Sequence, residues 1–340
     1  MINPAEMPAR LENFLAHRLP EVGKLVVRDY QPMTGGYSRL MARFTAELDG
    51  ATHRFVLRGD PPPGHGLMAT DRDVEWRLLS ALTAAGEVPM PRALHYDGLG
   101  VELGTKAIVL EMIESNSLLA ELQTAPEEAQ RRFALAAAEL AAAIHAVPLE
   151  VVPECIARPE SWDRYVDDSI AEWRRTEAAH GESDPIFRHV ATWLERNRPA
   201  PAPLRLVHGE LQTSNIIVDR SGVLRAVDWE MARIGDPRED LGWLRWMGRL
   251  SPPRIVELDV EAFCRRYAQH SGLDRDLVDP AALSYFAILP MGRALRGPLE
   301  QLELVASGAS TAVAPAYFAG VLTVFHVLWL DATRSHEVNA

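Results

Sequence analysis

A short run of polar residues beside two apolar segments has the composition of a phosphate and metal site. The apolar segments Ile216–Val218 and Val223–Val227 flank the turn Asp-Arg-Ser-Gly. This pattern predicts a β-hairpin, which would bring Asn215 at one end close to Asp228 at the other. With Glu210 on the preceding loop, an amide oxygen and two carboxylates would then lie together. Hard oxygen ligands of this kind suit Mg²⁺ beside phosphate.

Each of these residues also has a purely structural interpretation. Asn and Asp often cap turns next to strands, where their side chains bond to the backbone. For a single residue that interpretation is favoured over the chemical one. The whole ordered set favours chemistry: His-Gly-acid, then Asn, then Asp-Trp-Glu, then Gly-Asp-Pro and Asp-Leu, all within 207–241.

The elements that must position this set divide the chain into two parts. The first part contains an amphipathic helical segment and short β-like runs, and the dipeptide Asp49-Gly50 between two of these runs is a strong hairpin signal. One further helix and two more strands follow. The predicted helices are 8–19 and 71–86, and the predicted strands are 25–33, 40–48, 53–58, 91–98 and 106–113.

Beyond Glu114 the composition becomes helical. Residues 126–146 begin with Pro-Glu-Glu and continue through an Ala/Leu-rich stretch, as expected of a helix whose N-terminus favours acidic residues. A β-rich island at 204–228 follows the break Pro-Ala-Pro-Ala-Pro, and the rest of the chain is again helical. The sequence therefore predicts a small β-rich lobe and a larger helical lobe.

Composition excludes several classes of function. The chain has 340 residues, with 47 acidic and 35 basic side chains, a net charge of −12 and a pI of about 5.4. This balance argues against binding to nucleic acid or to a membrane surface, both of which require clustered cations. Two cysteines are too few for a disulfide framework or a thiolate metal site, so we expect a cytoplasmic protein. Its oligomeric state is left open.

The motifs of 207–241 resemble those of the aminoglycoside phosphotransferase-like kinases (phosphotransferase enzyme family). Within that family, DWEMARIGDPREDLGWL is most similar to the kinase domains fused to some acyl-CoA dehydrogenases. The resemblance implies an α+β, protein-kinase-like bilobal fold, with a small antiparallel sheet carrying one helix and a larger, mainly helical lobe. We expect the nucleotide-binding lobe, including the connector, at 1–113, and the catalytic and substrate-binding lobe at 114–340.

The resemblance also implies roles for the residues of the loop and hairpin. His208 matches the histidine that holds the catalytic loop in shape. Glu210 lies at the position of the catalytic base, Asn215 matches a metal-binding residue, and Asp228 matches the residue that links Mg²⁺ to the nucleotide phosphates.

Weaker motifs in the first lobe fit the same family. Gly35, Gly36 and Ser38 lie where its phosphate-covering loop belongs, although an ordinary hairpin turn is the commoner meaning of such a sequence. Arg58 occupies the position of the cation that holds the α- and β-phosphates. Glu75 matches its ion-pair partner, the alternative being a surface pair of little energetic value.

The connector AIVLEMIES would bind the nucleotide base. By resemblance, Leu110 lies at the back of the adenine pocket, while the carbonyl of Glu111 and the N–H of Ile113 bond to the adenine edge. These are backbone contacts, so the sequence does not separate ATP from GTP.

Two positions depart from the family pattern. Glu210 replaces Asp at the catalytic base, which moves the carboxylate by roughly 1 Å, and misplacement on that scale can cost ~10²-fold in rate. Arg58 replaces Lys and binds phosphate in a different geometry. The chain has only two lysines, Lys24 and Lys106, and neither can stand at this position.

The sequence thus predicts an ATP- and Mg²⁺-dependent kinase acting on a hydroxyl of a small molecule, with a hydroxyacyl-CoA or a similar catabolic intermediate favoured over an aminoglycoside. The alternative, based on Glu210, is a nucleotide-binding pseudokinase with a regulatory role.

No motif that would bind the phosphate acceptor is evident. Arg293 and Arg296 are candidate anion contacts, but a solvated face is the favoured interpretation. Trp243 and Trp246 are expected in the core. Asp236 and Asp240 are expected to fix the loop after Asp228.

Overall fold

A computed structural model describes residues 5–33, 40–60, 71–182, 184–311 and 313–337. The chain forms two compact units. Unit 1 comprises Met1–Gly86 and Met90–Glu114, and unit 2 comprises Glu87–Pro89 and Ser115–Ala340. The segment 87–89 belongs to unit 2, where the N–H of Ala226 donates to the carbonyl of Pro89 at 2.9 Å.

Unit 1 is built on a five-stranded antiparallel sheet with the strand order β1-β2-β3-β5-β4. At the β2–β3 turn, Asp49 and Gly50 both have positive φ, +49° and +86°, as a type I′ turn requires. The strands are β1 (Leu25–Pro32), β2 (Leu40–Leu48), β3 (Ala51–Gly59), β4 (Ala93–Asp97) and β5 (Ala107–Glu111).

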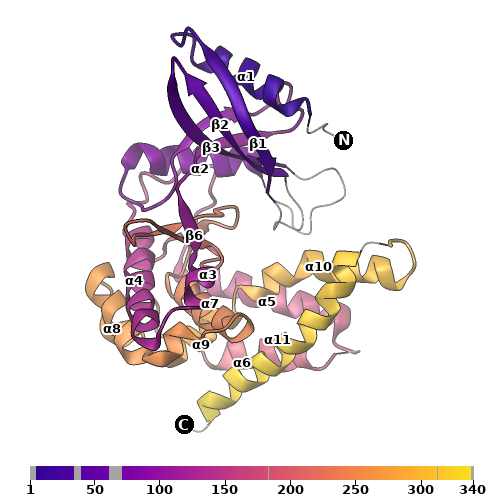
Figure 1. Ribbon diagram of the computed structural model, residues 1–340. Coiled ribbons are helices and arrows are strands. Elements are labelled where there is room, and N and C mark those ends of the chain that lie inside the picture. Colours follow the sequence, from indigo (N-terminus) through magenta and orange to yellow (C-terminus); the bar gives the residue numbers. More distant parts are fainter. Residues whose placement is uncertain (1–4, 34–39, 61–70, 183, 312, 338–340) are drawn as a thin grey trace. The chain divides into compact units, whose positions relative to one another are not determined.

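Two helices flank this sheet. Helix α1 (Met7–Arg18) lies along the sheet and buries Leu11 and Phe14 against it (Figure 1). Helix α2 (Arg72–Ala85) begins at a capping aspartate, Asp71, whose carboxylate accepts the N–H of Asp73 at 2.9 Å, and it ends at Gly86 with φ +71°. Caps of this kind define where a helix starts and stops.

Unit 2 contains two small antiparallel sheets that carry the polar set at 208–228. One sheet has the order β6-β8-β9 and the other pairs β10 with β7. These strands are β6 (Ser115–Ser117), β7 (Arg205–Val207), β8 (Ile216–Asp219), β9 (Leu224–Ala226) and β10 (Arg233–Gly235).

Helices make up the rest of unit 2, and in Figure 1 the long helix α11 crosses α10. One core cluster of these helices is rich in aromatic residues, with Trp173, Phe187, Phe286 and Trp329 fully or almost fully buried. The helices are α3 (Leu118–Leu122), α4 (Glu127–His145), α5 (Trp162–His180), α6 (Ile186–Arg196), α7 (Arg238–Leu250), α8 (Val260–Ser271), α9 (Pro280–Ile288), α10 (Met291–Ala306) and α11 (Val313–Glu337), with short 3₁₀ turns at Ile255–Leu258 and Arg275–Leu277.

The predicted fold is confirmed: a kinase-like antiparallel sheet precedes a helical region. The hairpin predicted after Asn215 is present as β8 and β9. The strands β6 and β10 were not predicted, because each has three residues and pairs with a partner distant in sequence. Among the described residues, no helix combines the length and apolarity needed to cross a bilayer.

Candidate active site

The candidate catalytic loop follows strand β7 and turns sharply at Gly209. This residue has φ +83°, and a Cβ atom there would lie 2.3 Å from the carbonyl oxygen of Met231. Only glycine fits both the left-handed backbone and the close approach. The loop therefore presents Glu210 at a fixed point, with the backbone of the segment after Asp228 directly behind it.

His208 links the two sides of this loop. Its Nε2–H donates to the carbonyl of Val227 at 3.0 Å, and its Nδ1 accepts the backbone N–H of Glu210 at 3.3 Å. These two contacts define a single neutral tautomer. The Trp229 ring lies against the imidazole, with ring centroids 4.8 Å apart. His208 thus ties Glu210 to the residue that precedes Asp228.

A fully buried carboxylate, that of Asp240, accepts hydrogen bonds from the backbone of the same loop. The two oxygens of Asp240, on α7, accept the backbone N–H groups of His208 at 2.7 Å and Gly209 at 2.8 Å. Nε2 of His145, at the end of α4, lies 2.9 Å from the carboxylate, and its Nδ1 lies 2.8 Å from the hydroxyl of Tyr267. We expected Asp240 to fix the loop after Asp228, but it fixes the loop before Glu210.

The charge state of Asp240 follows from these contacts. Burial alone would raise the pKa of its carboxyl group, but the hydrogen bond from His145 and the interactions with His145 and His208 outweigh it. The pKa of Asp240 therefore lies below its ordinary value. A carboxylate in this state is a permanent acceptor for the loop.

The hairpin brings Asn215 beside the residue before Asp228. Asn215 precedes β8, and its carbonyl accepts the N–H of Val227 at 2.9 Å. Its side-chain Nδ2 donates to the carbonyl of Glu210 at 3.0 Å. Through its side-chain amide and its backbone carbonyl, Asn215 thus connects the loop with Glu210 to the segment between β9 and Asp228.

Asn215 and Asp228 carry oxygen atoms of the type that Mg²⁺ prefers. Because Nδ2 of Asn215 is used as a donor, Oδ1 is the atom it offers to a cation, and Asp228 supplies a carboxylate. Asp228 has φ +71°, a left-handed conformation that aspartate tolerates better than most residues. Within the described ranges, no group of three or more His, Cys, Asp or Glu side chains is arranged to hold a metal ion by itself. A cation here would complete its shell with phosphate oxygens and water, as Mg²⁺ usually does.

In unit 1 the two residues expected at the phosphates form a buried ion pair. Arg58 Nε lies 3.3 Å from Glu75 Oε1, and the two side chains are 6% and 3% exposed. Arg72, which sequence analysis missed, binds the other oxygen of the same carboxylate and also contacts Asp60 Oδ1 at 2.9 Å. Glu75 is thus shared by two arginines, and the surface-pair alternative is excluded by burial.

The remaining nucleotide-binding candidates are only partly described. Gly35, Gly36 and Ser38 lie outside the described residues. Leu110 and Glu111 are the last two residues of β5, and Ile113 follows two positions later. Because β5 pairs with β3 so that Ile108 lies opposite Arg58, the connector continues from the strand next to the one that carries this cation.

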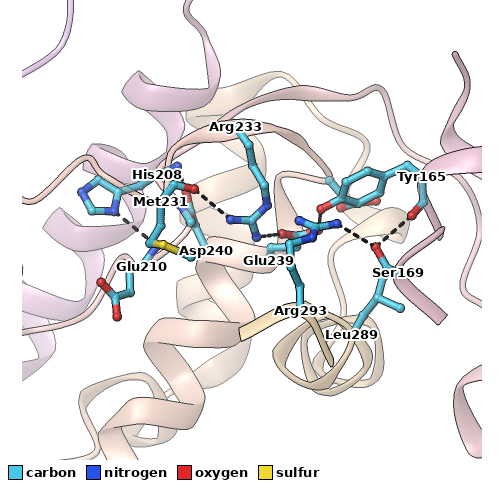
Figure 2. Close-up of polar contacts among 12 residues, drawn as sticks. Tyr165, Ser169, His208, Glu210, Met231, Arg233, Glu239, Asp240, Leu289 and Arg293 are labelled. Atoms are coloured by element: carbon cyan, nitrogen blue, oxygen red, sulfur yellow. Dashed lines mark hydrogen bonds and ion pairs between the residues drawn. The ribbon is translucent and has the colours of Figure 1, made fainter. Parts of the chain in front are cut away.

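A second charged group lies behind the catalytic loop (Figure 2). Arg233 donates to the carbonyl of Met231 at 3.0 Å and pairs with the buried carboxylate of Glu239. The other oxygen of Glu239 accepts the hydroxyl of Tyr165. Arg233 also approaches Gly209, where a Cβ atom would lie 2.4 Å from one of its nitrogens. Arg233 and Glu239 thus connect the catalytic loop at Gly209 with the segment after Asp228.

Sequence signals for these supporting residues are weak. His145 looked isolated in an Ala-rich helix, and Arg233 was one arginine in an arginine-rich chain. Both acquire partners only when α4, α5 and α7 pack. Trp243 and Trp246 lie in or against the core cluster, as expected. Arg293 differs from expectation: it is half-buried rather than on a solvated face.

Sequence comparisons agree with this geometry. A model of the family described as "Phosphotransferase enzyme family" matches residues 29–275. The rat protein "Acyl-CoA dehydrogenase family member 11" is 26% identical over 309 residues, which cover 82% of this chain but 38% of the rat protein. The "Aminoglycoside 3'-phosphotransferase" of Streptomyces fradiae is 28% identical over 269 residues, covering 72% of this chain and 91% of that protein.

The fold is shared with solved structures. One is a thermostable mutant of aminoglycoside phosphotransferase APH(4)-Ia in a ternary complex with ADP and hygromycin B. It has a TM-score of 0.61 at 18% sequence identity and covers 96% of this chain and 98% of its own. The chain therefore spans a whole phosphotransferase fold, but well under half of the acyl-CoA dehydrogenase family relatives' length. Since the family model covers most of its length, this chain belongs to the phosphotransferase enzyme family.

Proposed function

We propose that this protein transfers the γ-phosphate of ATP to a hydroxyl group of a small molecule. One observation carries the proposal: Asn215 bonds both to the carbonyl of Glu210 and to the N–H of Val227, next to Asp228. A carboxylate, an amide and a second carboxylate are thereby connected through one loop and one hairpin. Phosphoryl transfer needs little more from a protein than positioned groups of this kind.

Each residue then has a defined task. As the acceptor oxygen bonds to the γ-phosphorus and the bond to the ADP oxygen breaks, Glu210 takes the hydroxyl proton. Asn215 and Asp228 would hold Mg²⁺, which neutralises charge on the phosphates when bound. His208 keeps Glu210 in register through its contacts with Glu210 N and Val227 O.

The nucleotide would be bound by residues of unit 1. In the proposal Arg58, oriented by Glu75, contacts the α- and β-phosphates, and Gly35, Gly36 and Ser38 cover them. Leu110 lies behind the base, and the backbone of Glu111 and Ile113 bonds to its edge. The solved relative with ADP supports an adenine nucleotide, and GTP is the comparison to test.

For the acceptor we propose a hydroxyacyl-CoA or a related hydroxylated intermediate. The support is the similarity to proteins named as acyl-CoA dehydrogenase family members. The Streptomyces relative and the hygromycin B complex make aminoglycosides the natural comparison class.

The test is a transfer assay with purified protein, [γ-³²P]ATP and Mg²⁺ against both classes. The panel contains 3-hydroxybutyryl-CoA, 3-hydroxybutyrate, hygromycin B and kanamycin, with GTP as the alternative donor. We expect labelled product from a hydroxyacyl compound. Transfer to the aminoglycosides alone would overturn the acceptor proposal, and nucleotide binding without any transfer would favour the pseudokinase alternative.

The alternative rests on Glu210, and one pair of variants addresses it. Glu210→Gln keeps the size and removes the base, so we expect phosphoryl transfer to slow by at least ~10²-fold while MgADP affinity stays within about twofold. Glu210→Asp shortens the side chain and shows whether the longer acid is an adaptation. Full transfer activity in the Gln variant would mean that Glu210 is not the base.

A further inference from the structure

Arg293, the third residue of α10, is an unusual arginine in this chain. It is half-buried, and within the described residues its one hydrogen bond goes to the hydroxyl of Ser169 at 3.4 Å. Every other described arginine that is not exposed has an acidic partner, except Arg205, which donates to two backbone carbonyls. Half-buried guanidinium groups normally have such a partner, because desolvating an unpaired charge is costly.

The groups around Arg293 do not supply the missing negative charge. Glu239 interacts electrostatically with Arg293, but one of its oxygens pairs with Arg233 and the other accepts the hydroxyl of Tyr165. Burial and the charge of Glu239 raise the pKa of Tyr165, so its hydroxyl is neutral at pH 7. The charges of Arg233 and Glu239 cancel each other, so the positive charge of Arg293 has no negative counterpart in this group of residues.

The side chain is nevertheless held in one direction. Its guanidinium carbon lies 6.0 Å from the centroid of the Tyr165 ring, on α5, and its Nη2 reaches Ser169 one turn further along that helix. Ser169 in turn donates to the carbonyl of Tyr165 at 2.8 Å, so its oxygen is oriented to accept from Arg293. An oriented cation costs less to engage than a flexible one, because less side-chain entropy is lost.

Arg293 is linked to the catalytic loop by a row of side chains. In Figure 2 a continuous row of residues runs from Glu210 past Met231, Arg233 and Glu239 to Arg293. All of these residues belong to unit 2, and hydrogen bonds and an ion pair connect Met231, Arg233 and Glu239. Glu210 and Arg293 thus lie at the two ends of one row of side chains.

We propose that Arg293 binds an anionic group of the acceptor, so that the substrate is an alcohol that also carries a carboxylate or a phosphate. The proposal rests on the proposed phosphotransferase function and adds the charge of its substrate. The acceptor would supply the charge that the protein leaves unpaired. This excludes polycationic acceptors, for which an uncompensated arginine beside the loop is unfavourable.

The test uses matched anionic and neutral alcohols with the full chain saturated with MgADP. The probes are 3-hydroxybutyrate against 3-hydroxybutyramide, and glycerol 3-phosphate against glycerol, titrated by calorimetry. We expect at least one anionic probe to bind about tenfold or more tightly than its neutral partner, the ratio that one charge-assisted hydrogen bond provides. The pair that shows the larger ratio distinguishes carboxylate from phosphate.

Two variants assign the preference to Arg293. Arg293→Gln should remove it without changing MgADP affinity, and Arg293→Lys should restore part of it because the charge returns. Arg296→Gln is the matched control: it lies three residues further on the same helix, is exposed, and has Glu172 at 3.9 Å. Its anion preference should equal that of the wild type.

Three results would overturn the proposal: no anion preference in the wild type, an unchanged preference in Arg293→Gln, or an equal loss in Arg296→Gln. If Arg293 served only as a second counter-charge for Glu239, the Gln variant would lose thermal stability and keep the wild-type preference. Failure of the proposed function is a separate result. It would appear as anion binding without phosphoryl transfer in the wild type.

Discussion

Asp228 combines a strained backbone with a charge, and the two can be separated by the choice of substitution. Its φ of +71° is tolerated by Asn, so Asp228→Asn removes the charge with less backbone disturbance than Asp228→Ala. We expect the Mg²⁺-dependent part of ADP affinity to be lost, while ADP affinity in EDTA stays unchanged. Calorimetry with and without Mg²⁺ measures both. An unchanged Mg²⁺ dependence would remove Asp228 from the metal site.

The buried cluster around Glu75 has a net charge that single substitutions can change. Arg58, Arg72, Glu75 and Asp60 sum to zero. Because Arg72 takes part of the charge of Glu75, Arg58 keeps more of its own for phosphate. Arg72→Met should therefore weaken MgADP binding by about tenfold, whereas Asp60→Asn, which leaves one positive charge, should strengthen it.

The opposite effects expected for Arg72→Met and Asp60→Asn distinguish the effect of charge on nucleotide binding from that of packing. If both variants weaken nucleotide binding equally, the cluster acts through its shape alone. Arg28→Met is a suitable control, since Arg28 forms an exposed ion pair with Glu47 elsewhere in unit 1. We expect its MgADP affinity to match that of the wild type.

At the scale of elements, helices α4 and α7 hold the catalytic loop through Asp240. Asp240→Asn would place an amide donor against the N–H groups of His208 and Gly209, and disrupting a buried charged contact costs about 3–5 kcal/mol. Because the folded pKa of Asp240 is lowered, its contribution is fully present above its unfolded value near pH 4. It is lost as the pH falls through the lower, folded value.

Thermal unfolding measured at pH 7 and at about pH 3 tests whether the stabilisation by Asp240 is lost in acid. The difference in unfolding temperature between the wild type and Asp240→Asn should be large at pH 7 and smaller at about pH 3. Asp168→Asn is the control, because that aspartate is exposed on α5, where it pairs with Arg164. A gap that widened in acid would contradict the role given to the Asp240 carboxylate.

The sequence predicted the helices and longer strands better than it predicted the contacts that support the candidate site. The helices and longer strands follow from local patterns, such as the alternation in 40–48 and the Asp-Gly turn, and the hairpin after Asn215 follows from its own two runs. The supporting contacts of the loop were not predictable. Asp240 meets His145 across 95 residues, and Tyr165 meets Glu239 across 74. Such contacts depend on packing rather than on local sequence.

At the scale of the whole molecule, each unit has its own core and the chain carries a net charge of −12. This charge repels an anionic acceptor at long range, although Arg293 attracts it at short range. The two effects differ in their response to salt. The screening length falls from about 30 Å at 0.01 M to about 8 Å at 0.15 M, so distant charges are screened strongly and a half-buried contact much less.

The affinity of an anionic acceptor should therefore rise with salt over this range. We expect a severalfold increase for glycerol 3-phosphate, a smaller one for 3-hydroxybutyrate and none for glycerol, measured as Kd in MgADP-saturated protein between 10 and 150 mM NaCl. Arg293→Gln should bind more weakly at every salt concentration but show the same relative increase, because the distant charges remain. Affinity that fell steadily with salt in the wild type would mean that local attraction dominates and that the net charge does not reach the acceptor.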